Sequence, residues 1–156
     1  MKTKGDTLSE LSFKTSSGQT HTLDDLRAHS AVIFFFYPGD FTPGCTKEVC
    51  SFRDAFGDLT QEGAALFGIS LDSDEKHERF REQYNLPFPL IADTDKSLSR
   101  EFGVLRLGGL LKIRRATFVV DPKKKQIIEA FSNEFNMNIH AERALETLKT
   151  LKGSQG

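Results

Sequence analysis

The sequence predicts an α/β fold in which a mixed central β-sheet carries helices on both faces. Short apolar, β-rich runs alternate with helical patterns along the chain, which is typical of a parallel sheet. The run AVIFFFYP at residues 31–38 is apolar without interruption, as in a strand that is buried on both faces in the middle of a sheet. The last two predicted strands are separated only by a turn, so we expect them to pair antiparallel.

The remaining elements follow from local patterns. Residues 11–26, LSFKTSSGQTHTLDDL, alternate apolar and polar side chains around Ser17-Gly18, which predicts a hairpin and then a short helical turn at residues 23–27. Further strands are predicted at residues 65–72, 88–94, 114–121 and 125–132, and helices at residues 43–63, 72–86, 96–104 and 139–153. Glycines are expected to end the last two helices, at Gly103 and Gly153. This succession fits a thioredoxin-like fold, and we expect one domain over residues 1–156.

Composition argues against several classes of function. The 156 residues carry a formal net charge of -1, which favours neither a nucleic acid nor an anionic membrane as partner. The first residues do not resemble a signal peptide, and no run reaches the roughly 18 apolar residues of a membrane span. With only two cysteines, the chain is expected in a reducing compartment such as the cytoplasm.

No metal or cofactor is expected either. The four histidines lie far apart in the sequence, form no short-spaced ligand pair, and are predicted to lie mostly at the surface. They are His21, His29, His77 and His140.

The two cysteines, Cys45 and Cys50, lie five positions apart at the start of a predicted helix. Thr42 is a suitable N-cap and Pro43 suits the first helical position, so Cys45 would be the third helical residue. Backbone N–H groups there lack acceptors within the helix and favour an anion. A thiolate is such an anion, so Cys45 is expected to be ionised and nucleophilic.

The stretch YPGDFTPGCTKEVCSFRD resembles the active site of peroxiredoxins, whose motif carries proline, threonine and the peroxidatic cysteine at the spacing of Pro38, Thr42 and Cys45. With its second cysteine in the same helix, this stretch resembles the peroxiredoxin Q (bacterioferritin comigratory protein) subgroup. The resemblance continues through GISLDS, FPLIADTDKSLSREFGV and RRATFVVDP and covers most of residues 5–150. Residues 106–113 depart from it, because they are more apolar than this family leads us to expect.

The resemblance implies a thiol peroxidase that reduces hydrogen peroxide and organic hydroperoxides. Cys45 would be oxidised to a sulfenic acid, and Cys50 would resolve it as an intramolecular disulfide. Pro38 would shield the site and the Thr42 hydroxyl would orient the peroxide. Thioredoxin or a similar dithiol would be the reductant, and the chain would be a monomer or a weak homodimer.

An arginine is also implied, two residues before a Ser/Thr-Phe pair on a late strand. In RRATFVV this spacing selects Arg115 over Arg114. Alternation along a strand places the two on opposite faces without saying which is inward, so Arg115 could instead be an outward residue paired with an acid. Glu48, three residues after Cys45, is expected mainly to support the helix and is a weaker candidate for the site network.

A disulfide between Cys45 and Cys50 is incompatible with an intact helix. Five residues of helix give about 7.5 Å of rise and about 140° of rotation, so the Cα atoms would lie about 8 to 9 Å apart. A disulfide spans at most about 7 Å. We therefore predict that the first turns of the helix unwind after each oxidation.

Other interpretations remain open at this point. Both cysteines could be buried hydrophobic residues without chemistry, and Thr42 could be only an N-cap. A thioredoxin-type disulfide oxidoreductase would share the fold, although the chain has no C-x-x-C motif. A non-catalytic binding or chaperone module on the same fold is a third possibility.

Overall fold

The computed structural model describes residues 1–106 and 113–155, with side chains up to residue 151. The apolar segment 106–113 therefore lies, apart from its two end residues, outside the described residues. Within the described part of the chain, no helix is both long and apolar enough to cross a lipid bilayer.

The centre of the molecule is strand β3 (Ala31–Phe36), in which all six residues are buried. It pairs parallel with β4 (Ala64–Ser70) and antiparallel with β6 (Ala116–Asp121). Strands β5 (Leu90–Ala92) and β7 (Gln126–Ser132) complete a five-stranded sheet in the order β5-β4-β3-β6-β7. The predicted mixed sheet, its central strand and the antiparallel last pair are confirmed.

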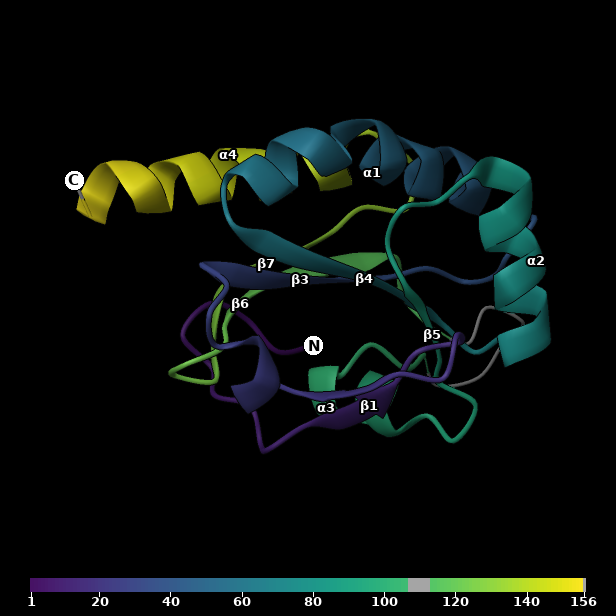
Figure 1. Ribbon diagram of the computed structural model, residues 1–156, viewed down its shortest axis with the longest axis horizontal. Helices are drawn as coiled ribbons and strands as arrows, with labels where there is room; N and C mark the ends of the chain where they lie inside the picture. The colour runs from purple at the N-terminus through teal and green to yellow at the C-terminus, as the bar shows by residue number, and fades with distance from the viewer. Residues whose placement is uncertain (107–112, 156) are drawn as a thin grey trace.

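Three helices lie on one face of this sheet. Helices α1 (Pro43–Gln61) and α4 (Ile139–Gln155) run above the strands in Figure 1, and α2 (Asp74–Tyr84) lies at the right-hand end. Helix α4 continues past Gly153, so the predicted glycine stop is wrong. A glycine ends a helix only where its backbone turns into the left-handed region, and here the helical conformation is kept.

The other face is covered by smaller elements. Helix α3 (Ser97–Phe102) lies there together with a hairpin of β1 (Ser12–Lys14) and β2 (Thr20–Thr22) (Figure 1). A short 3-10 helix, Asp24–Leu26, follows the hairpin where a helical turn is predicted. Gly103 ends α3 with φ of 71°, as expected.

Strand β3 separates two hydrophobic cores, which explains its unbroken apolar run. Ile33 and Phe35 point to the side of α1 and α4, where the Phe35 and Phe52 rings stack with 4.1 Å between their centroids. Phe34 and Phe36 point to the hairpin and α3. Because successive residues of a strand point to opposite faces, a strand covered on both sides needs apolar residues at every position.

Two of the four histidines are buried, contrary to the prediction that they lie mostly at the surface. His77 and His140 have no exposed area. Each is buried because both of its ring nitrogens have hydrogen-bond partners, which for His140 are Thr117 and the Asn133 carbonyl. Burial lowers the pKa of His140.

Candidate active site

The loop from β3 to α1 leads from the carboxyl end of the central strand to the predicted site. Pro38 is half-buried at its start and Thr42 is exposed at its end. Phe41, between them, has φ of 64°, in the left-handed region that costs a residue with a side chain about 1–2 kcal/mol. This loop conformation therefore has to be held by its surroundings.

Thr42 is the N-cap residue of α1, as predicted, but its side chain makes no capping hydrogen bond. The hydroxyl instead donates to the Gly39 carbonyl oxygen at 3.0 Å. Its oxygen lone pairs remain able to accept a hydrogen bond. The N–H groups of Gly44 and Cys45 belong to the first turn, where no acceptor exists within the helix. The start of α1 thus presents an acceptor hydroxyl and backbone donors together.

Cys45 is buried, with 1% of its surface exposed, and a cation lies directly against its sulfur. Arg115 Nη1 is 3.3 Å from Cys45 Sγ, and the Arg115 side chain is also buried. Arg114 is exposed, so the structure places Arg115 and not its neighbour beside Cys45. The start of α1 packs closely against two side chains here, because a Cβ at Gly44 would lie 3.1 Å from Met137 Cε and 3.4 Å from Arg115 Nη2.

Glu48 is a member of this group whose importance the sequence interpretation underestimated. Its Oε1 accepts a hydrogen bond from Arg115 Nη1 at 2.8 Å, and the side chain is fully buried. Burial raises the pKa of Glu48 to about 8, although the Arg115 charge opposes this. The available signal was its position one turn after Cys45 on the helix face that carries the buried residues Val49 and Phe52.

Two acidic side chains, Glu48 and Glu134, contact Arg115. Glu134 accepts from the Arg115 backbone N–H at 3.0 Å, and its second oxygen lies 3.9 Å from Nε. Burial would lower the pKa of Arg115, but the charges of Glu48 and Cys45 raise it, so the group remains a cation. Within residues 1–106 and 113–151, Arg115 Nε and Glu48 Oε2 have no hydrogen-bond partner. One donor of Arg115 and one oxygen of Glu48 are thus buried without a partner among the described residues.

Cys50 also lies in α1, half-buried, and both cysteines are reduced in this structure. Burial raises the pKa of the Cys50 thiol, against the opposing charge of Arg53. The two cysteines thus have different surroundings, because Cys45 contacts a cation while Cys50 is held as a neutral thiol.

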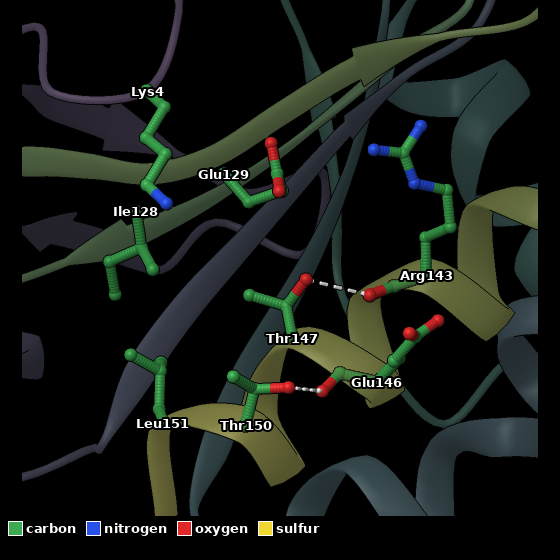
Figure 2. Close-up of a pocket in the computed structure, with 8 residues that line it drawn as sticks. All are labelled: Lys4, Ile128, Glu129, Arg143, Glu146, Thr147, Thr150 and Leu151. Carbon is green, nitrogen blue, oxygen red and sulfur yellow. Dashed lines mark hydrogen bonds between the residues drawn. The ribbon is translucent and has the colours of Figure 1, made fainter. Parts of the chain in front are cut away.

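A separate hollow of about 240 Å³ lies between β7 and α4, away from Cys45 (Figure 2). Charges of both signs line it, including Lys4, Glu129 and Arg143. The Thr147 and Thr150 hydroxyls in it donate to carbonyls of their own helix. The lining therefore favours no particular ligand charge.

Among the described residues, one cluster has three side chains that are able to bind a metal ion. They are Asp40, Asp72 and His77. Their ligand atoms lie within 4.8 Å of one another, but these atoms already hydrogen-bond to protein groups. The Lys76 ammonium group, 3.0 Å from Asp72, adds a positive charge. This arrangement fits an internal hydrogen-bonded network better than a cation site.

Comparison with known proteins defines the class. The family model described as "AhpC/TSA family" matches residues 5–129, so the chain belongs to the AhpC/TSA family of thioredoxin-fold peroxiredoxins, which are thiol peroxidases. Within it, relatives named peroxiredoxin Bcp or peroxiredoxin Q are 36% and 37% identical to this chain. The predicted subgroup and activity are confirmed, and the disulfide oxidoreductase and chaperone alternatives lose their support.

Three similar proteins illustrate the match. The putative peroxiredoxin Rv1608c of Mycobacterium tuberculosis is 38% identical over 154 residues, covering 97% of this chain and 99% of that protein. The crystal structure of peroxidoxin BcpB from the same species has a TM-score of 0.89 at 36% identity, covering 97% and 99% of the two chains. A bacterioferritin comigratory protein of Xanthomonas campestris, described for its alkyl peroxide reduction activity, has a TM-score of 0.82 at 32% identity, covering 90% and 91%.

Proposed function

We propose that Cys45 is the peroxidatic cysteine of this thiol peroxidase, with Arg115, Thr42 and Pro38 forming its site and Cys50 as the resolving thiol. The observation that carries the proposal is the 3.3 Å contact between Arg115 Nη1 and Cys45 Sγ. A buried guanidinium at this distance stabilises negative charge on sulfur and on an oxygen bound next to it.

In the first step, the Cys45 thiolate attacks the terminal peroxide oxygen and the O–O bond breaks. The sulfur becomes a sulfenic acid, and the leaving oxygen takes a proton and departs as water or an alcohol. The Thr42 hydroxyl, which donates to Gly39, accepts a hydrogen bond from the peroxide O–H and orients it. Pro38 limits the access of water to the sulfur.

Ionisation alone does not explain a fast reaction. For thiols in general, lowering the pKa from about 8.5 to about 6 raises the thiolate fraction about thirtyfold at pH 7. Nucleophilicity falls by about tenfold over the same interval, if the Brønsted slope of disulfide exchange applies. The larger contribution is stabilisation of charge on the breaking O–O bond, where one well-placed donor is worth about a hundredfold or more.

In the second step, Cys50 displaces water from the sulfenic acid and forms the disulfide, and a dithiol then reduces both sulfurs again. The start of α1 has to unwind for this, which separates Glu48 from Arg115 and exposes Cys50. Exposure removes the burial that raises the pKa of Cys50. Hydrogen exchange tests this step, because amides 45–52 should lose protection in the disulfide form. Equal protection in the reduced and disulfide forms would exclude unwinding.

A peroxide substrate and a thiol reductant follow from the family. We propose further that organic hydroperoxides are substrates, with support from the alkyl peroxide reduction described for the X. campestris relative. The proposal includes thioredoxin or a similar dithiol as the reductant, a monomer or weak homodimer, and one domain over residues 1–156 acting in the cytoplasm.

Intact-mass measurement after one equivalent of hydrogen peroxide tests the sulfur roles. The unmodified chain should lose two hydrogens as the disulfide forms, and Cys50→Ser should gain one oxygen as the sulfenic acid persists. Cys45→Ser should keep its mass and leave the peroxide unconsumed. Unchanged masses of the first two proteins would contradict the proposal.

A further inference from the structure

A group of buried polar side chains lies behind the loop that carries Thr42, and the reaction described above does not use it. Tyr37, Asp40 and His77 are nearly or fully buried and hydrogen-bonded to one another. We propose that Asp40 and His77 are positioning residues for peroxide reduction, because their contact fixes the loop that carries Thr42. This inference rests on the proposed function of the Cys45 site.

The contact between His77 and Asp40 is the centre of this group. His77 Nδ1 lies 2.6 Å from Asp40 Oδ2, and His77 Nε2 lies 3.0 Å from the Ile91 carbonyl oxygen. A carbonyl oxygen can only accept, so Nε2 carries a hydrogen, and the short Nδ1–Oδ2 contact requires a second one. One proton thus lies between Nδ1 and Oδ2, and this contact ties the loop to α2 and β5.

Asp40 is held from two further directions. Its Oδ1 accepts from the Tyr37 hydroxyl at 2.6 Å, and its backbone N–H donates to Asp72 Oδ2 at 2.7 Å. Burial and the nearby Asp40 charge raise the pKa of Tyr37, so its hydroxyl keeps its hydrogen. Although burial opposes it, hydrogen bonds from Asp40 N–H, Ser70 and Lys76 lower the pKa of Asp72, which stays an ionised acceptor. Side chain and backbone of Asp40 are thus both fixed.

This anchoring accounts for the unusual backbone of the next residue. Phe41 has φ of 64°, and its ring packs on Phe80 with 5.0 Å between centroids. Asp40 points inward and Thr42 begins α1, so Phe41 makes the sharp turn between them. A residue with a side chain keeps such a conformation only where its neighbours impose it. Without the Asp40 contacts, the loop should relax and move the Thr42 hydroxyl away from its position at the helix start.

Two rate constants test the inference. Both are measured in the Cys50→Ser variant, in which Cys45 is the only cysteine that can react. Oxidation of Cys45 by hydrogen peroxide requires an oriented substrate, whereas alkylation by iodoacetamide requires only an accessible thiolate. Asp40→Ala and His77→Ala should each lower the peroxide rate constant by about tenfold to a hundredfold, as expected for a reacting group displaced by about 1 Å. The alkylation rate should change little. The double variant should be about as slow as the slower of the two single variants, because both remove the contact between Asp40 and His77.

Asp40→Asn is the conservative variant. Its amide can accept from Tyr37 and donate to a neutral His77, so it keeps the contacts and should retain most of the peroxide rate. Ser73→Ala is the matched control, because it removes the side-chain cap of α2 at 3.2 Å from Lys76 N and leaves the Asp40–His77 contact intact. Its ratio of the two rate constants should equal that of the parent.

Equal peroxide rates in Asp40→Ala and the parent would overturn the inference. An equal decrease of the peroxide and the alkylation rate constants would also overturn it, since this would indicate a purely structural role. If the parent itself does not react with peroxide, the proposed function fails. If the parent reacts and all variants react equally, only the positioning role fails.

Discussion

The two faces of the central sheet differ in what they bury. The hairpin and α3 face buries a cluster of aromatic rings, whose members are Phe13, Phe34, Phe36, Phe67, Phe102 and Phe118. The helix face also buries aromatic rings, such as Phe35 and Phe52, but in addition it buries most of the titratable groups, namely Tyr37, Asp40, Cys45, Glu48, His77, Arg115 and His140. On the hairpin and α3 face, the buried Asp93 side chain accepts hydrogen bonds from backbone N–H groups at the start of α3.

This difference indicates that the two faces contribute differently to folding stability and to the chemistry at Cys45. Apolar burial contributes most of the free energy of folding, whereas each buried charge is costly unless it is paired. The hairpin face therefore serves mainly stability. The helix face accepts the cost of buried titratable groups, and two of them, Arg115 and Glu48, contact each other beside the sulfur of Cys45. Substitutions on the two faces should consequently change different measured quantities.

The largest expected effect is on the hairpin face. Phe102→Ala should lower the free energy of unfolding by about 3–5 kcal/mol, because it deletes a fully buried ring. That ring packs on Phe34, Phe36 and Phe118 at centroid distances of 4.7 to 5.3 Å. Urea unfolding measures the loss, and Phe102→Leu should show a smaller one. The peroxide rate constant of the folded fraction should stay unchanged, and a tenfold decrease would show that the two faces are coupled.

The second effect is on the helix face and should appear in rate rather than stability. Arg115→Lys keeps the charge but loses the planar group that can contact Cys45 and a peroxide oxygen together. The rate constant for oxidation of Cys45 should fall about a hundredfold, the usual effect of losing one transition-state donor. Stopped-flow measurement checks it, with the exposed Arg114→Lys as matched control. Equal rate constants in Arg115→Lys and Arg114→Lys would contradict the proposed role of Arg115.

The predictability of these faces from sequence also differs. The unbroken run at β3, the start of α1 and the cysteine spacing are local patterns, so the sequence was sufficient to predict the sheet and the helix that carries both cysteines. Glu48 and His77 could not be assigned in the same way. Glu48 is buried because Arg115, 67 residues further on, reaches it, and His77 because Asp40, 37 residues earlier, pairs with it. Such contacts depend on how distant segments meet. The helical spacing of Glu48 indicates that its side chain faces inward, but it does not identify Arg115 as the partner.

The last prediction concerns the pH dependence of stability. Burial raises the pKa of Glu48 from 4.5 to about 8, so between these pH values the folded chain holds a proton that the unfolded chain has released. Stability should therefore fall as the pH rises from about 5 through about 8. Glu48→Gln has no such proton and should show a weaker decrease in urea midpoint over this range. Phe102→Ala, in contrast, should lower stability about equally at every pH. If Glu48→Gln also differed from the parent by a constant amount, Glu48 would behave as a packing residue, and the distinction between the two faces would not extend to it.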